Sequence, residues 1–251
     1  MTLSIITPTY NSATTLIDTL QSVASQDYSN IEHIIVDGAS QDDTLKIVAD
    51  FPHVSKVISE PDGGLYDAIN KGIKLASGDV IGILNSDDFF AHPNVLSTIA
   101  KAFDDQHTDC LYGDVVYVQA DDTSKIIRYY SSRHFHPQKF AKGFMPAHPT
   151  FYLKKKYYEQ YGLHNTQYKI AADFELLLRM LYIHKLKYTY INQPLVHMRA
   201  GGISNASLQN RMLINKEILQ ACQEHHVHTN KAKLYLRYFR KAMEFVGAKK
   251  K

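Results

Sequence analysis

The chain has 251 residues, of which 45% are hydrophobic and 21% are charged. These values are ordinary for a globular protein, and the length allows one large domain or two small ones with a full hydrophobic core. No run approaches the roughly 18 apolar residues of a membrane span, and residues 1–8 lack the basic segment that begins a signal peptide. Cys110 and Cys222 fit no disulfide framework or zinc spacing. We therefore expect a cytoplasmic protein.

The net charge of +3 is unevenly distributed along the chain. Residues 228–251 contain eight Lys or Arg and one Glu, a charge of +7, so residues 1–227 sum to −4. A basic terminal segment of this kind either lies on an anionic membrane surface or forms a solvated helix. Nucleic-acid binding is not expected, because the basic residues are confined to this segment and the remainder is acidic.

The expected elements of the first half alternate between strands and helices. Strands are predicted at residues 3–7, 31–36, 54–59, 80–84 and 110–118, and helices at residues 16–25, 44–50, 65–76 and 93–104. Ser40–Asp43 matches the capping-box pattern at the start of the second of these helices. Alternation of this kind is typical of βαβ units and predicts an α/β fold with a parallel sheet.

The alternation fades after residue 118. Further elements are predicted as a strand at 126–130, a helix at 170–184, a strand at 188–191 and two C-terminal helices after the Gly201-Gly202 pair. We expect one domain over residues 1–204, with a nucleotide-binding half at 1–118 and an acceptor half at 119–204. Residues 205–251 then form a basic helical extension.

Several familiar classes of α/β protein are disfavoured by their missing motifs. The turn after the first strand, Thr7–Ser12, has no glycine, whereas dinucleotide-binding folds need glycines there to approach a pyrophosphate. The chain also lacks a P-loop and the nucleophile elbow of α/β hydrolases.

Acidic residues instead follow the predicted strands. They are Asp37, Glu60, Asp62, Asp87, Asp88 and Asp114. Ligands of open α/β sheets bind at the carboxyl ends of strands, and Mg²⁺ or Mn²⁺ prefers carboxylates together with substrate phosphates. The Asp87-Asp88 pair after the buried strand 80–84 therefore predicts a divalent-cation site. The alternative is a polar turn that caps the helix starting near Pro93.

Four segments in order carry a resemblance to a known family. They are SIITPTYN (4–11), VDGASQDDT (36–44), SEPDGGLYDAINKG (59–72) and LNSDD (84–88). This pattern resembles family 2 glycosyltransferases, in particular the small bacterial enzymes of polysaccharide, lipopolysaccharide and O-antigen assembly. The resemblance covers roughly residues 3–204 and implies a GT-A fold, a mostly parallel Rossmann-like sheet flanked by helices.

The resemblance implies donor-binding residues in the first half. Pro8 and Thr9 would contact the nucleotide base through their backbones, and Asp37 would accept a hydrogen bond from it. Asp62 and Lys71 would line the nucleotide and its phosphates. Alternatively, Asp37 is a turn aspartate beside a glycine and Lys71 an exposed helix lysine.

The resemblance also implies a metal site for Mn²⁺ or Mg²⁺. Asp88 would bind the metal, and Asp87 would face the ribose or the metal. This chain has Ser-Asp-Asp where the family has Asp-x-Asp, so the role of Asp88 is the firmer of the two. His197 is a further candidate ligand, and Arg199 a candidate phosphate clamp.

The acceptor half holds the candidate base. Asp173 resembles the family's aspartate that opens a helix and deprotonates the acceptor hydroxyl, and its apolar neighbours are expected to raise its pKa. A plain helix-start aspartate is the alternative. Glu175 is the second candidate base, and His148 is expected near the acceptor and the donor sugar.

These assignments predict an inverting, metal-dependent transfer from a nucleoside diphosphate sugar, with a UDP-sugar favoured, to a saccharide acceptor. The chain has no Trp, and hence no Q-x-x-R-W motif of processive enzymes, so a single addition to a lipid-linked acceptor at the inner face of the membrane is expected. A catalytically inactive nucleotide-sugar-binding or scaffold subunit is the alternative. A sugar-nucleotide pyrophosphorylase is disfavoured, because Thr7–Ser12 lacks its Gly-rich basic loop.

Overall fold

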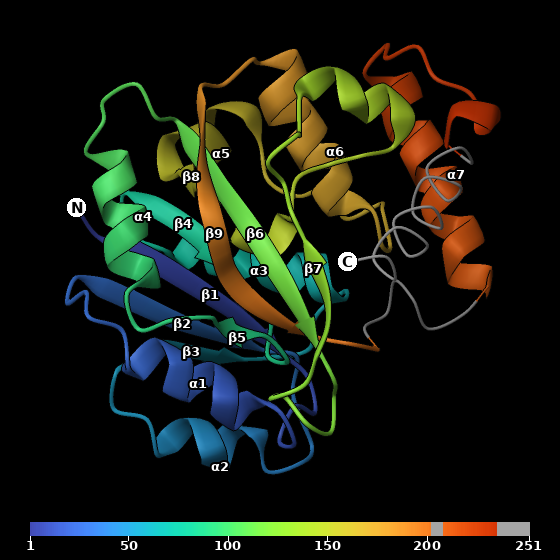
Figure 1. Ribbon diagram of the computed structural model, residues 1–251. Coiled ribbons are helices and arrows are strands. Elements are labelled where there is room, and N and C mark those ends of the chain that lie inside the picture. The colour runs from blue at the N-terminus through green and yellow to red at the C-terminus, as the bar shows by residue number, and fades with distance from the viewer. Residues whose placement is uncertain (202–207, 235–251) are drawn as a thin grey trace.

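The computed structural model describes residues 1–201 and 208–234 (Figure 1). The strands are β1 (Leu3–Thr9), β2 (Ile31–Asp37), β3 (Val54–Ser59), β4 (Val80–Ile83), β5 (Phe89–Phe90), β6 (Cys110–Val118), β7 (Ile126–Tyr130), β8 (Tyr152–Lys154) and β9 (Tyr188–Arg199). The helices are α1 (Leu16–Ala24), α2 (Thr44–Ala49), α3 (Leu65–Leu75), α4 (Val95–Phe103), α5 (Lys155–Tyr161), α6 (Ala172–Leu178) and α7 (Leu208–Glu224). Short turns of helix lie at η1 (Pro137–Lys142), η2 (His148–Thr150) and the π-helical η3 (Arg179–Ile183).

The strands form a single sheet in the part of the chain that is described. Their order is β3-β2-β1-β4-β8-β6-β9-β5, and β7 pairs with β6. The first four strands are parallel, whereas β8 is antiparallel to both β4 and β6. The predicted α/β class is confirmed, because a partly parallel sheet is covered by helices.

Helices cover both faces of β1 and β2, and these strands are almost wholly buried. Successive side chains of a strand point to opposite faces. Ile6 and Ile34 belong to the core beneath α3, while Ile5 packs in the core with α4, and Ile35 packs in the core with α1 and α2.

Because β1 to β4 are parallel, their carboxyl ends meet along one side of the sheet, which we call the carboxyl edge. Thr9 and Asp37 are register partners at the ends of β1 and β2, and Asp37 and Ser59 are partners at the ends of β2 and β3. The predicted parallel arrangement of these strands therefore brings the polar residues that follow them together at the carboxyl edge.

The second half departs from the sequence predictions. β8 and α5 were not predicted, and the strand expected at 188–191 continues to Arg199 as the long β9. The helix expected at 170–184 is divided into α6 and η3. Asp114 lies inside β6 rather than at a strand end, and its carboxylate accepts hydrogen bonds from Tyr129, Tyr190 and Ser132.

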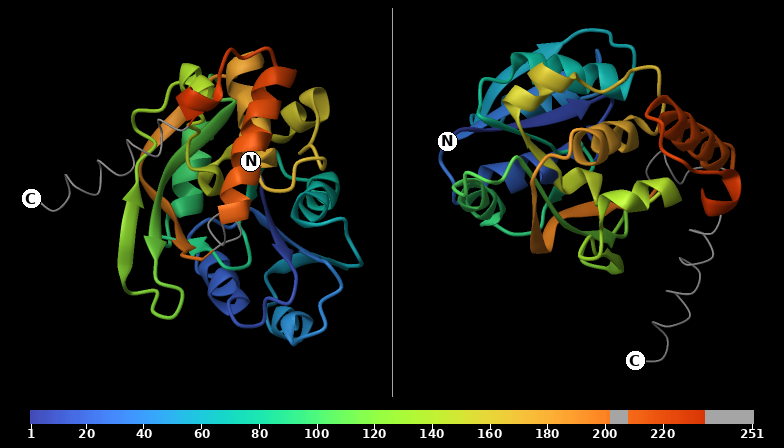
Figure 2. Two further views of the ribbon diagram at one scale, coloured as in Figure 1. Left: turned by 90° about the vertical axis from the view of Figure 1, so that its right-hand side faces the viewer. Right: turned by 90° about the horizontal axis from the view of Figure 1, so that it is seen from above.

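The C-terminal region contributes α7, which lies beside α6 in Figures 1 and 2. Two helices were expected after Gly201-Gly202; the second stays a prediction, because residues 235–251 lie outside the described residues. Within residues 1–201 and 208–234, no helix is long and apolar enough to cross a bilayer.

Candidate active site

Asp37 ends β2 and is the most heavily hydrogen-bonded carboxylate of the carboxyl edge. It accepts from Thr9 Oγ1 (3.1 Å), from the backbone N (2.9 Å) and Oγ (2.5 Å) of Ser40, and from Ser59 Oγ (2.7 Å). Burial opposes ionisation, but the bonds from Ser40 and Ser59 hold the pKa of Asp37 below its ordinary value. Four acceptor positions are occupied, so an incoming N–H group would have to replace one of these donors.

Gly38 allows the Asp62 carboxylate to lie against the end of β2. A Cβ atom at Gly38 would lie 2.7 Å from Asp62 Oδ2, so a larger residue would require this carboxylate to shift. Tyr10 lies beside the same position and is 65% exposed. This aromatic ring was not identified from the sequence, although its position directly after the Thr7-Pro8-Thr9 strand end was a usable signal.

The Gly63-Gly64 turn brings Asp62 and the start of α3 together. Gly64 has φ +112°, a conformation that favours glycine, and its N–H donates to Asp62 Oδ1 (2.8 Å). Lys71 braces the same turn, because its Nζ lies 2.8 Å from Glu60, 3.6 Å from Asp67 and 3.0 Å from the Pro61 carbonyl. Lys71 is therefore not an ordinary exposed helix lysine, and a phosphate would compete with these partners.

The acidic turn, residues 84–88, carries the predicted metal ligands. Asp88 is 1% exposed; its Oδ2 accepts from Asn85 (3.2 Å), whereas its Oδ1 has no hydrogen-bond partner. Burial and the neighbouring Asp87 raise the pKa of Asp88 well above its ordinary value, and burial also raises the pKa of Asp87. An unpaired buried carboxylate oxygen beside a second carboxylate fits a divalent cation, which would satisfy both.

β9 brings His197 and Arg199 to the acidic turn. His197 is the register partner of Phe89 and packs edge-on against its ring. Arg199 donates to the Asp87 carbonyl (2.8 Å), pairs with Asp18 of α1 and lies 5.4 Å from the Phe89 ring centre. Arg199 thus anchors the acidic turn, and Asp18 is a partner that sequence analysis missed. Among the described residues, no three His, Cys, Asp or Glu side chains form a complete metal-binding group.

Asp173 stands in the first turn of α6 within a second cluster. Its Oδ2 lies 3.2 Å from Tyr66 Oη and 3.9 Å from His148 Nε2, and its Oδ1 lies 3.4 Å from His164 Nε2. Burial disfavours the charge, but His148, His164 and Tyr66 together lower the pKa of Asp173 below its ordinary value. The expectation of a raised pKa is therefore wrong, because polar partners outweigh the apolar neighbours. The structure does bring His148 to Asp173, as expected.

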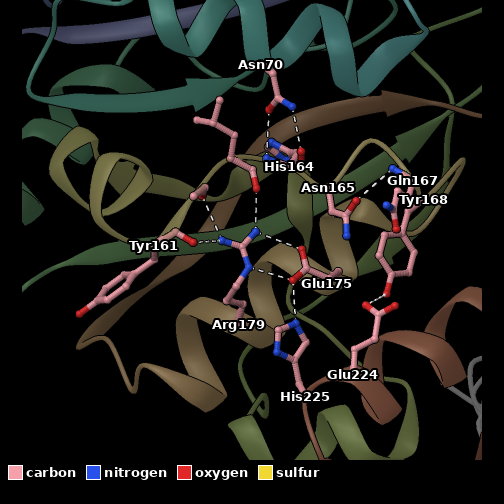
Figure 3. A network of polar contacts seen from close by, with 12 residues as sticks. Asn70, Tyr161, His164, Asn165, Gln167, Tyr168, Glu175, Arg179, Glu224 and His225 are labelled. Carbon is pink, nitrogen blue, oxygen red and sulfur yellow. Dashed lines mark hydrogen bonds and ion pairs between the residues drawn. The ribbon is translucent and has the colours of Figure 1, made fainter.

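His164 is held firmly in this cluster. Its backbone exchanges two hydrogen bonds with the Asn70 side chain, 2.8 and 3.0 Å long, as Figure 3 shows. Its ring, 2% exposed at the side chain, stacks on Tyr66 at 5.7 Å and on Tyr158 at 6.4 Å. Tyr66 and His164 were not identified from the sequence, because nothing in the local pattern links residues so far apart.

Glu175, the second candidate base, does not join the Asp173 cluster. Its Oε1 lies 2.8 Å from Arg179 Nε and 2.7 Å from His225 Nε2, and its Oε2 accepts from Arg179 as well (Figure 3). Residues two apart on a helix face different directions. Both carboxylate oxygens are used, so Glu175 forms part of the contact between α6 and the segment after α7.

Comparison with known proteins identifies the family. Residues 4–162 match the model for Glycosyl transferase family 2. A PGL/p-HBAD biosynthesis glycosyltransferase of Mycobacterium bovis is 29% identical over 224 residues, which cover 86% of this chain and 82% of the relative.

Solved glycosyltransferases share the fold. Residues 1–349 of TarS from S. aureus superpose with a TM-score of 0.68 at 20% identity, covering 88% of this chain and 65% of that one. A mannosyltransferase from Pyrobaculum calidifontis, solved with GDP-Man and Mn²⁺, gives 0.62 at 18% identity, covering 91% and 65%. The chain thus spans slightly less than two thirds of each solved chain. The family match extends over more than half of the sequence, and the chain belongs to glycosyltransferase family 2.

Proposed function

We propose that the protein transfers a sugar, with inversion, from a nucleoside diphosphate sugar to a saccharide hydroxyl, with the help of a divalent cation. The observation that carries this proposal is the contact between Tyr66 and Asp173. Tyr66 belongs to the 59–72 segment at the carboxyl edge, so the candidate base adjoins the segment expected to hold the diphosphate. A UDP-sugar is the first donor to test, since TarS has also been solved with UDP-GlcNAc.

Asp173 is the proposed general base. Its low pKa keeps it ionised and ready to accept the proton of the acceptor hydroxyl. The Tyr66 hydroxyl has one proton, and its shorter contact, 2.7 Å, is to the Ile170 carbonyl. When that proton turns instead to Asp173 Oδ2, at 3.2 Å, it stabilises the ionised carboxylate. His148 and His164 stabilise the ionised form before the transfer.

Asp88 and Asp87, with His197 beside them, would hold Mn²⁺ or Mg²⁺. A bound cation supplies Lewis-acid stabilisation of the charge that grows on the leaving diphosphate. Asp62, Thr9 and Pro8 would line the donor, while Asp37 keeps the strand ends together through its hydrogen bonds. Arg199 would act through the Asp87 carbonyl that it holds.

The proposed acceptor is a lipid-linked saccharide of cell-surface polysaccharide synthesis, used at the inner face of the membrane. The relative named for PGL/p-HBAD biosynthesis supports a role in building glycoconjugates. The basic segment of residues 228–251 supports contact with an anionic surface, although most of it lies outside the described residues.

Isothermal titration of UDP, GDP, CDP and dTDP, with Mn²⁺ and then with EDTA, tests the donor class. Binding of one nucleotide that needs Mn²⁺ and is lost in Asp88→Asn supports the proposal. Asp173→Asn should keep this binding and lose transfer to a panel of p-nitrophenyl glycosides, by about 100-fold or more. Binding without turnover in the unmodified protein would favour a scaffold subunit, and no binding at all would overturn the proposal.

A further inference from the structure

Helix α7 contacts the peptide segment that precedes Asp173. Glu217, at the middle of α7, accepts three backbone hydrogen bonds: Lys169 N to Oε1 (2.8 Å), and Ile170 N (3.0 Å) and Ala171 N (2.8 Å) to Oε2. Its side chain belongs to the buried set, at 5% exposure. A buried carboxylate with both oxygens on backbone amides is a strong, directional contact.

The segment 169–171 has no local means of satisfying these amides. Ala171 is the N-cap residue of α6, and no side chain caps the helix from within. Buried N–H groups left without a partner are costly. An N-cap side chain would accept only from amides inside the first turn of the helix. The amides of residues 169–171 are instead satisfied by Glu217, which lies 46 positions beyond Ala171.

The opposite side of the same segment is held by the active-site cluster. The Ile170 carbonyl accepts from the Tyr66 hydroxyl at 2.7 Å, and that hydroxyl also contacts Asp173. Glu217 therefore fixes the N–H side of the segment while Tyr66 fixes its carbonyl side. Asp173 follows two residues after Ala171, so its position depends on both anchors.

The other contacts of α7 do not involve the backbone amides of residues 169–171. Ile218, Ala221 and Cys222 are buried in the same core as α6. Glu224 Oε2 accepts from the Tyr168 hydroxyl at 2.5 Å, as Figure 3 shows, and the docking of α7 against α6 is visible in Figure 2. Glu224 is therefore a suitable control for Glu217, because it is a glutamate of the same helix that does not bind the amides of residues 169–171.

We propose that Glu217 is a positioning residue for the transfer reaction, and that α7 is part of the catalytic unit. The inference rests on the proposed role of Asp173 as the base. Replacing Glu217 removes one anchor of the segment 169–171, so the carboxylate of Asp173 is no longer aligned with the acceptor hydroxyl. Nucleotide binding at the carboxyl edge is unaffected, because Glu217 makes no contact there.

Glu217→Gln is compared with Glu224→Gln, which removes a carboxylate from the same helix. Nucleotide affinity is measured by calorimetry with UDP and Mn²⁺, and turnover by hydrolysis and transfer with UDP-N-acetylglucosamine or the donor that the calorimetric panel selects. Glu217→Gln should lower kcat by roughly 10- to 100-fold, as a small misplacement of a reacting group does. Its donor KM and UDP affinity should stay within twofold of the unmodified protein. Glu224→Gln should change kcat by less than threefold. Each variant is assayed at the same number of degrees below its own melting temperature.

Equal kcat losses in the two variants, or a loss in Glu217→Gln that appears in KM alone, would overturn the inference. If Glu217→Gln does not fold, Glu217→Asp and amide hydrogen exchange of the unmodified protein decide the matter. The amides of residues 169–171 should exchange as slowly as those of α7, and fast exchange there would overturn the inference. Transfer that survives in Asp173→Asn would instead overturn the proposed base, whatever Glu217 does.

Discussion

The Tyr66 hydroxyl oxygen lies 3.2 Å from Asp173 Oδ2, although the two residues are 107 positions apart in the chain. The contact joins the start of α3, at the carboxyl edge, to the start of α6 in the second half. The same hydroxyl donates to the Ile170 carbonyl. A single phenol thus links the segment expected to hold the donor with the residue proposed to activate the acceptor.

Tyr66→Phe should lower kcat by about tenfold, which corresponds to the loss of one hydrogen bond to a charged group of roughly 1.5 kcal/mol. The Phe ring keeps the stacking on His164, and UDP affinity should not change. Tyr158→Phe is the control, because the Tyr158 ring also stacks on His164. Similar kcat losses in the two variants would contradict a specific role for the Tyr66 hydroxyl.

His148→Gln should shift the acid limb of the kcat–pH profile to higher pH. Burial raises the pKa of Asp173, but the charge of His148 is the first of the groups that lower it. Without that charge the pKa of Asp173 rises, so the base is protonated, and transfer is lost, at a higher pH than in the unmodified protein. The control is His136→Gln, which replaces a histidine in another loop. An unchanged acid limb in His148→Gln would contradict the proposed interaction.

His33 should make the fold sensitive to mild acid. The ring is buried between Thr7 Oγ1 (3.0 Å) and His53 Nε2 (3.1 Å), and burial followed by the charge of His53 lowers its pKa to about 3. The unfolded chain takes up a proton near pH 6.5 and the folded one does not, so stability falls as the pH drops from about 6.5 towards 3.

The loss from His33 should reach about 2 kcal/mol between pH 7.5 and pH 5. Urea unfolding at the two pH values measures it, and His33→Gln should lose clearly less. Burial also lowers the pKa of His53, which acts in the same direction and remains in the variant. Glu32, with a pKa of about 2, contributes only below its ordinary value of 4.5. Equal losses in both proteins would contradict the prediction.

Removal of residues 235–251 should release the protein from anionic vesicles. This segment has six Lys or Arg and one Glu, and each basic residue contributes about 1 kcal/mol near an anionic surface. A cut at residue 228 is unsuitable, because Leu234 is buried and Thr229 donates to the Ala141 carbonyl (2.6 Å). Co-sedimentation with phosphatidylglycerol vesicles, compared with phosphatidylcholine vesicles, measures the effect. Unchanged sedimentation after the truncation would contradict a membrane role for the segment.

The first half of the fold was predictable because short β-type runs alternate there with helical segments. Each strand predicted at residues 3–7, 31–36, 54–59 and 80–84 was found within about two residues of its predicted bounds, although β3 is largely exposed. The second half was less predictable. Tyr152–Lys154 is too short to give a periodic signal, and Asn192-Gln193-Pro194 interrupts the pattern of β9, which nonetheless continues through it.

The candidate site was predictable where it follows a strand and unpredictable where it depends on distant partners. Asp88 and Asp37 were found at the carboxyl edge from the strand pattern alone. The partners that lower the pKa of Asp173 come from three other segments, which no local pattern reveals. The capping box predicted at Ser40 is wrong. Ser40 Oγ donates to Asp37, which lies at the end of β2, and does not cap α2.

The pairing of β5 with β9 has a consequence for synthesis on the ribosome. Within the described residues, Phe89 and Phe90 pair with His197 and Val196. β4 pairs with β1 on one side and, on the other, with β8 at residues 152–154. The acidic turn therefore joins two strands, β4 and β5, that each pair with a segment synthesised later. A nascent chain ending near residue 118 has its nucleotide-facing residues but not the strands that fix them. We expect protease-resistant structure to arise only after Arg199 has left the exit tunnel, in one late and cooperative step.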